Sequence, residues 1–220
     1  MSTSIIPVPE LARQAKVASR RLAVASSAEK DAALLAAADL LVARAADLLE
    51  ANAADVARAE ADGTSPTLVD RLRLTEARID NMAGGLRQVA ALRDPVGEIT
   101  DGWVRPNGLR IERVRVPLGV VAIIYESRPN VTSDAAALCL KSGNAAFLRG
   151  SSSAIDSNIA IATVMREALE KVGLPADGVV LVHDTSRAAA TEFMQQRGLV
   201  DCLIPRGGRS LIESILENAT

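Results

Sequence analysis

Arginine and glycine stand side by side in two short segments whose residue types can bind an anion. The glycine lets a ligand approach the backbone, and the guanidinium group can make bidentate contacts with phosphate oxygens. Where such a segment opens a helix, backbone N–H groups also point toward the anion. The pattern therefore predicts a phosphate-bearing ligand. The residues are Arg149, Gly150 and Ser151 in the first segment and Arg206, Gly207 and Gly208 in the second.

A third polar segment, Glu126 to Asn130, follows the apolar run VVAIIY. Its Arg128 suits a carboxylate or a phosphate, although a surface salt bridge explains an arginine here equally well. Asn130 precedes a helical stretch, and asparagine is a common N-cap, so the residues alone favour a capping role for it.

Several common chemical motifs are absent from the sequence. Neither G-x-G-x-x-G nor G-x-x-x-x-G-K-[ST] occurs, which argues against the usual dinucleotide fingerprint and an ATP-binding P-loop. His183 is the only histidine and is expected in a surface loop, and no CxxC or HExxH spacing occurs, so no metal site is expected. Cys139 and Cys202 stand in apolar segments and are interpreted as unreactive, and two isolated cysteines indicate a reducing compartment.

The elements that must position these loops are short apolar runs alternating with helical stretches of ten or more residues. This alternation is typical of βαβ units, so we expect an α/β fold with a Rossmann-like parallel sheet and ligands beyond the carboxyl ends of its strands. The expected strands are Val120 to Tyr125, Ala145 to Leu148, Val179 to Val182 and Cys202 to Ile204. The expected helices are Val131 to Lys141, Ile155 to Lys171, Arg187 to Gln196 and one after Gly208.

Residues 1–95 are predicted to be helical. Ser26 and Glu29 have the spacing of a capping box, and leucine-rich doublets seven residues apart predict one long helix from there to a break at Gly63 to Pro66. Arg44 and Asp47 could pair on it at i, i+3. A further helix is expected from about Thr75 to Leu92, before a proline.

In residues 96–116 the apolar residues no longer recur at helical spacing but roughly alternate with polar ones, which predicts a β-hairpin. Val96 to Val104 and Leu109 to Val116 flank an Asn-Gly pair, which favours a tight turn. Half of the strand residues are polar, so one face is expected to be exposed or used for assembly into oligomers.

Composition narrows the function classes. The 220 residues are 49% hydrophobic and 24% charged with a formal charge of −2, which argues against nucleic-acid binding and a polybasic membrane surface. No apolar run approaches the roughly 20 residues of a membrane span. Met1 to Glu10 does not have the pattern of a signal peptide, so a cytoplasmic location is expected.

Two long segments, VPLGVVAIIYESRPNVTSDAAALCLKSGNAAFLRG and LIPRGGRSLI, closely resemble the gamma-glutamyl phosphate reductases of the aldehyde dehydrogenase superfamily. The earlier segments SSAEKDAALLAAADLL and DRLRLTEARI fit the same family in the same order. The resemblance implies reduction of L-glutamate 5-phosphate to L-glutamate 5-semialdehyde with release of phosphate, in proline biosynthesis, with NADP(H) as cofactor. It also implies a homo-oligomer and association with a glutamate 5-kinase.

The resemblance assigns roles to the polar loops. Asn130 matches the oxyanion donor of the superfamily. Arg149 matches a residue suited to the 2′-phosphate of NADPH, with Gly150 and Ser151 beside it, and Arg206, Gly207 and Gly208 match the segment near the cofactor pyrophosphate. Glu126 and Arg128 would bind substrate.

The family's nucleophilic cysteine has no match in this sequence. We therefore expect the chain to be the N-terminal portion of a longer enzyme, with 117–220 forming an incomplete cofactor-binding core, no catalytic domain, and no activity of its own. The alternative is a non-catalytic nucleotide-binding module. The end of the chain at Thr220, before a further strand of this fold, favours the first interpretation.

Overall fold

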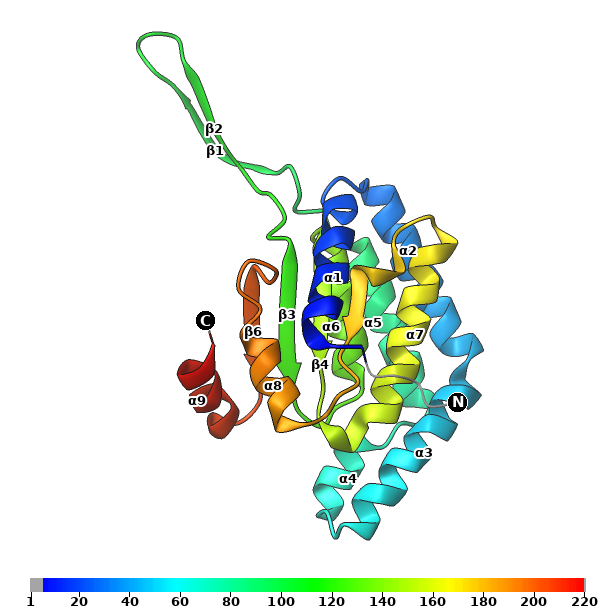
Figure 1. The fold of residues 1–220 in the computed structure, drawn as a ribbon. Helices are drawn as coiled ribbons and strands as arrows, with labels where there is room; N and C mark the ends of the chain where they lie inside the picture. The colour runs from blue at the N-terminus through cyan, green and yellow to red at the C-terminus, as the bar shows by residue number, and fades with distance from the viewer. Residues whose placement is uncertain (1–5, 220) are drawn as a thin grey trace.

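The computed structural model describes residues 6–219. The expectations about Thr220 and about the first five residues of Met1 to Glu10 lie outside this part of the chain. The described residues form a helical region, a projecting hairpin and a parallel sheet flanked by helices (Figure 1). The α/β class and the order of its parts are as predicted.

The parallel sheet has the strand order β5-β4-β3-β6, with every pair parallel. Its strands are β3 (Val120–Tyr125), β4 (Ala145–Arg149), β5 (Val179–Leu181) and β6 (Cys202–Arg206). The helices between and after them are α6 (Asn130–Lys141), α7 (Ile155–Lys171), α8 (Arg187–Met194) and α9 (Arg209–Asn218). Short 3-10 turns at Ser152–Ala154 and Ala176–Gly178 precede α7 and β5. The predicted βαβ alternation is confirmed.

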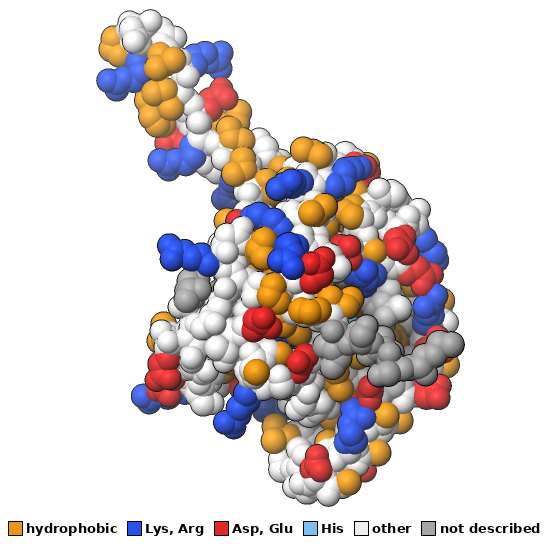
Figure 2. Space-filling view, in the orientation of Figure 1, with side chains coloured by type: hydrophobic (Ala, Val, Ile, Leu, Met, Phe, Trp, Pro, Cys, Tyr) orange, Lys and Arg blue, Asp and Glu red, His pale blue; other side chains and the backbone are white. Residues whose placement is uncertain are grey.

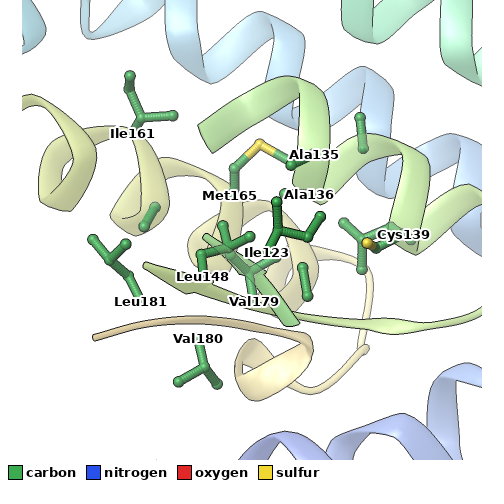
Figure 3. Close-up of a cluster of buried hydrophobic side chains, with 14 of the residues drawn as sticks. Ile123, Ala135, Ala136, Cys139, Leu148, Ile161, Met165, Val179, Val180 and Leu181 are labelled. Atoms are coloured by element: carbon green, nitrogen blue, oxygen red, sulfur yellow. The ribbon is translucent and has the colours of Figure 1, made fainter. Parts of the chain in front are cut away.

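Helices cover both faces of this sheet. On one face α6 and α7 pack against the strands, and α2, α3 and α5 pack onto them; α1 (Val8–Leu22) and α8 lie against the other face (Figure 1). Every residue of β3 is buried, as expected for a central strand of a parallel sheet. Figure 3 shows Ile123 and Leu148 facing Ala136 and Met165 from the covering helices.

The N-terminal helices differ from the prediction at two points. The expected long helix is two helices, α2 (Ser27–Ala43) and α3 (Ala45–Ala61), which meet at Arg44. Arg44 forms an ion pair with Glu167 of α7 and not with Asp47, because its side chain turns toward the neighbouring helix. The leucine spacing continues across the junction, so the hydrophobic pattern alone did not reveal the change of direction.

The second difference is α4 (Pro66–Leu72), which lies where only a break was expected. Proline is tolerated at the first turn of a helix, and here it begins one. By contrast, the Ser26 capping box is present and α5 (Glu76–Ala91) follows Thr75 as predicted.

The predicted hairpin is confirmed and projects from the body (Figure 1). Strands β1 (Ile99–Val104) and β2 (Arg110–Val114) pair antiparallel, with Trp103 opposite Ile111. Gly108 in the turn has φ of +84°, which glycine adopts without strain. All of β1 and nearly all of β2 are exposed, and Figure 2 shows apolar and basic side chains gathered on the hairpin.

Candidate functional site

The predicted loops meet at the carboxyl edge of the sheet. Because β3 pairs with both β4 and β6, the loops that follow these three strands are neighbours. Tyr125 stands opposite Arg206 in this register, so Glu126 lies directly beside the Gly207–Gly208 segment. This edge, where the strand order reverses, is where parallel α/β sheets bind ligands.

The start of α9 already holds an anionic group from the chain itself. The backbone N–H of Gly208 donates to Glu126 Oε1 at 3.0 Å. A Cβ at Gly207 would come within 2.7 Å of Glu126 and of Leu211, so a side chain there would collide with both. The helix N-terminus therefore accepts an oxyanion at close range, as its glycines predicted. Glu126, predicted to bind substrate, lies at this phosphate-type position.

Arg149, at the end of β4, is half-buried and fixed by one edge of its guanidinium group. Its Nη2 donates to the backbone oxygens of Thr185 at 3.1 Å and of Ser186 at 3.0 Å. Its Nε is buried and finds no hydrogen-bond partner within residues 6–219. Burial lowers the pKa of the Arg149 guanidinium, and the carboxylate of Asp184 opposes that change. Nη1 also makes no hydrogen bond among the described residues, and it is not buried, so it is the donor that a ligand can reach.

The loop after β4 brings small and hydroxyl side chains beside Arg149. Gly150 is buried against the amide of Asn158, and a larger residue would collide with it. Ser153 Oγ lies 2.7 Å from Ser151 Oγ and 2.9 Å from Ser127 Oγ, so three hydroxyl groups join this loop to the one after β3. Hydroxyl groups both donate and accept hydrogen bonds, so this cluster suits a sugar-phosphate ligand.

Asn130 is the first residue of α6, and the N-cap position belongs to Pro129 without a side-chain cap. The N-cap interpretation of Asn130 is therefore wrong. Its Nδ2 donates to Asp134 Oδ2 at 2.9 Å, one turn along the helix. Burial raises the pKa of Asp134, while the bond from Asn130 and the charge of Arg206 oppose that rise. The second N–H of the Asn130 amide is available to a ligand.

Two adjoining cavities lie over this edge. The first, of about 440 Å³, is bounded by α4, α5 and the start of α6 and contains Asn130 and Asp134. The second, of about 540 Å³, reaches the end of β6 and contains Glu126, Arg206 and Gly207. Arg71 and Arg128 line both cavities. Sequence reasoning found Arg128 but missed Arg71, because α4 was not expected; the motif DRLRL around Arg71 was the only available signal.

Neither cysteine lines these cavities. Cys139 lies in α6, facing the sheet (Figure 3), and burial raises the pKa of its thiol to about 12. Cys202 stands on β6, half-buried and opposite Val121. A nucleophilic cysteine needs accessible thiolate, which Cys139 does not provide. The prediction that Cys139 is unreactive is supported.

The remaining expectations concern His183, metals and membranes. His183 is exposed in the loop after β5, as expected. No group of three or more histidine, cysteine or acidic residues suited to a metal occurs in the described range 6–219. In that same range, every helix is too short or too polar to cross a membrane.

Comparisons with known proteins identify the family of this chain. A family model described as the aldehyde dehydrogenase family matches residues 7–220. A curated gamma-glutamyl phosphate reductase of Geobacillus sp. (strain WCH70) is 53% identical over 209 residues, covering 95% of this chain and 51% of that protein.

Solved structures extend the comparison. A crystal structure of gamma-glutamyl phosphate reductase from Thermotoga maritima matches with a TM-score of 0.95 and 44% identity, covering 98% of this chain and 52% of the other. The glyceraldehyde-3-phosphate dehydrogenase GapN of Methanocaldococcus jannaschii, solved with NADP, matches with a TM-score of 0.74 and 19% identity over 96% of this chain and 43% of the other, which indicates a shared fold alone. The chain spans about half the length of the relatives that it matches.

Proposed function

This chain belongs to the aldehyde dehydrogenase family, and we propose that it is the cofactor-binding half of a gamma-glutamyl phosphate reductase. The overall reaction would consume L-glutamate 5-phosphate, NADPH and a proton and give L-glutamate 5-semialdehyde, NADP⁺ and phosphate. The observation that carries the proposal is the start of α9, which holds a carboxylate at 3.0 Å from Gly208 N beside the arginine-lined cavities.

The hydrogen-bond donors at this edge of the sheet fit NADPH. Arg206, Gly207 and Gly208 would hold the pyrophosphate, in the position where Glu126 now accepts a hydrogen bond. Arg149 would bind the 2′-phosphate through Nη1, which unlike Nε is not buried and has no hydrogen-bond partner among residues 6–219, with Gly150 and Ser151 beside it. When bound, the cofactor would supply the hydride for the reduction.

Within this chain, Asn130 is the residue proposed to assist the chemistry directly. Attack on the acyl phosphate places negative charge on the carbonyl oxygen, and the free N–H of the Asn130 amide would donate to it. Asp134 holds the amide in place through its hydrogen bond. The attacking cysteine is proposed to lie outside these residues, because Cys139 is buried with its thiol pKa raised to about 12.

The proposal is tested by assaying the whole protein that contains this chain in both directions. We expect NADPH consumption with L-glutamate 5-phosphate, and NADP⁺ reduction with L-glutamate 5-semialdehyde and phosphate. The 220-residue chain alone should bind NADPH without turnover. Binding without turnover by the whole protein would instead support a non-catalytic nucleotide-binding module. Turnover by the chain alone, lost on Cys139→Ser or Cys202→Ser, would contradict the placement of the nucleophile.

The hairpin is proposed to join copies of this protein. Its exposed apolar residues Trp103, Val104 and Leu109 project from the body, and its two strands have unpaired outer edges. Light scattering should show an oligomer of the whole protein that Trp103→Glu dissociates. An unchanged mass would contradict this role. Association with a glutamate 5-kinase remains a prediction from the resemblance, and a cytoplasmic location remains a prediction from the N-terminal sequence and the two isolated cysteines.

A further inference from the structure

Two arginines in the cavities beside Asn130 have no anionic partner among residues 6–219. Arg71 comes from α4 and Arg128 from the loop between β3 and α6, and both line both cavities. In the part of the chain that the structure describes, neither side chain forms a hydrogen bond or an ion pair. Their neighbours differ, because Arg73 pairs with Glu60 at 2.9 Å and Arg78 with Asp70 at 3.1 Å.

The first of these cavities, bounded by α4, α5 and the start of α6, also contains a carboxylate. Asp134 lines it from the first turns of α6 and accepts one hydrogen bond, from Asn130. A carboxylate has acceptor sites for several donors, so Asp134 can accept more bonds from a ligand. Asp70 is already paired with Arg78 through both oxygens. The cavity of about 440 Å³ therefore contains two arginines without partners, Arg71 and Arg128, and one carboxylate, Asp134, that can accept further hydrogen bonds.

This mixture of charges discriminates between the phosphate end and the α-amino acid end of the proposed substrate. A phosphate group carries only negative charge, and Asp134 would repel it. The head of an α-amino acid carries a carboxylate and an ammonium group, which match the arginines and Asp134 respectively. Charge complementarity therefore favours the amino-acid end of the substrate over its phosphate end in this cavity.

We propose that the cavity between α4, α5 and α6 binds the α-amino acid head of the substrate, with Arg71 and Arg128 on the α-carboxylate and Asp134 on the α-ammonium. The assignment rests on the proposed function, because it supposes a glutamyl substrate. It places the reacting carbonyl at the other end of the substrate, toward Asn130. Arg71 and Asp134 are thus specificity-determining residues that the sequence motifs did not reveal.

The test uses the whole protein and the reverse reaction, in which the aldehyde, phosphate and NADP⁺ have separate KM values. We expect Arg71→Ala to raise the KM for L-glutamate 5-semialdehyde by about 10- to 100-fold, the effect of losing one charged hydrogen-bonding partner. The KM values for phosphate and NADP⁺ should not change. Arg20→Ala is the matched control, because Arg20 is exposed on α1 and lines neither cavity.

A second variant tests the ammonium contact. Wild type should prefer L-glutamate 5-semialdehyde to 5-oxopentanoate, which lacks the α-ammonium group, and Asp134→Asn should reduce that preference by about tenfold or more. The asparagine can keep the hydrogen bond with Asn130, and the thermal unfolding midpoint reports any structural damage.

The outcomes separate this assignment from the proposed function. A higher KM for phosphate in Arg71→Ala would show that the arginines bind phosphate, and unchanged KM values with unchanged substrate preference would show that the cavity does not bind the head group. Either result would overturn the assignment while wild-type turnover upheld the proposed function. Absence of turnover in wild type would overturn both.

Discussion

Replacing Arg149 with alanine gives the sharpest test of the cofactor assignment. The substitution removes the half-buried guanidinium group, whose accessible Nη1 has no hydrogen-bond partner among the described residues. It also removes the bonds from Nη2 to the backbone oxygens of Thr185 and Ser186, at 3.1 and 3.0 Å. The first loss would affect only a ligand with a 2′-phosphate, whereas the second would loosen the loop for any ligand.

The expected loss of NADPH affinity in Arg149→Ala follows from these contacts. A hydrogen bond to a charged group contributes about 1.5–3 kcal/mol, and each 1.4 kcal/mol changes a dissociation constant about tenfold. One such bond from Arg149 to the 2′-phosphate therefore predicts a loss of about 10- to 100-fold in NADPH affinity. NADH lacks that phosphate, so its affinity should change only through the loop.

Fluorescence titration with NADPH and NADH measures both effects in the same variant. The ratio of the two dissociation constants cancels the contribution of the loop, so it reports the phosphate contact alone. Arg187→Ala is the control, because Arg187 is exposed at the start of α8 near the same loop. A ratio in Arg149→Ala equal to that of wild type would refute the assignment, whatever happens to the individual affinities.

Three further predictions concern catalysis, stability and reactivity. Asn130→Ala should lower kcat of the whole enzyme by about 10²–10³ if its amide is an oxyanion donor; a fall in unfolding midpoint without a fall in kcat would indicate a structural role. Asp55→Ala should lower the free energy of unfolding by about 3 kcal/mol in chemical denaturation, because buried Asp55 accepts bonds from Ser157 N and Oγ at 2.8 and 2.6 Å. Asp39→Ala, which breaks an exposed ion pair, should cost less than about 1 kcal/mol, and equal losses would contradict this reasoning. Cys139, with its thiol pKa raised to about 12, should resist iodoacetamide at neutral pH until the protein unfolds, and mass spectrometry of labelled peptides would expose any native-state labelling.

The parallel sheet could be predicted from sequence because its signals are local. Each strand is a short apolar run such as Val120–Tyr125, and each helix has a polar or glycine boundary. Parallel pairing then brings the loops after β3, β4 and β6 to one edge as a consequence of topology. The Gly207–Gly208 segment was thus correctly expected beside the other loops, although its contact with Glu126 was not foreseen.

The two errors have different origins: one is a contact distant in sequence, and the other is a helix start displaced by one residue. Arg44 was expected to pair within its own helix, but Glu167 approaches it from α7. Asn130 has a capping residue type and position, yet α6 begins one residue earlier and Asp134 becomes its partner. The local sequence pattern indicates which residues can make a contact, whereas the packing of the helices and strands determines which of these contacts form.

The helical region is part of the site and not only a cover for the sheet. Buried Asn52 of α3 donates to Leu72 O at the end of α4 at 2.9 Å and accepts from Leu74 N at 2.7 Å. The same amide donates to Ser157 Oγ of α7 at 3.0 Å. These bonds tie the end of α4 to α3 and to the helix that follows the β4 loop, and so hold Arg71 over the carboxyl edge. Because Asn52 and Ser157 are separated by 105 residues, no local pattern could have linked them to the cavity.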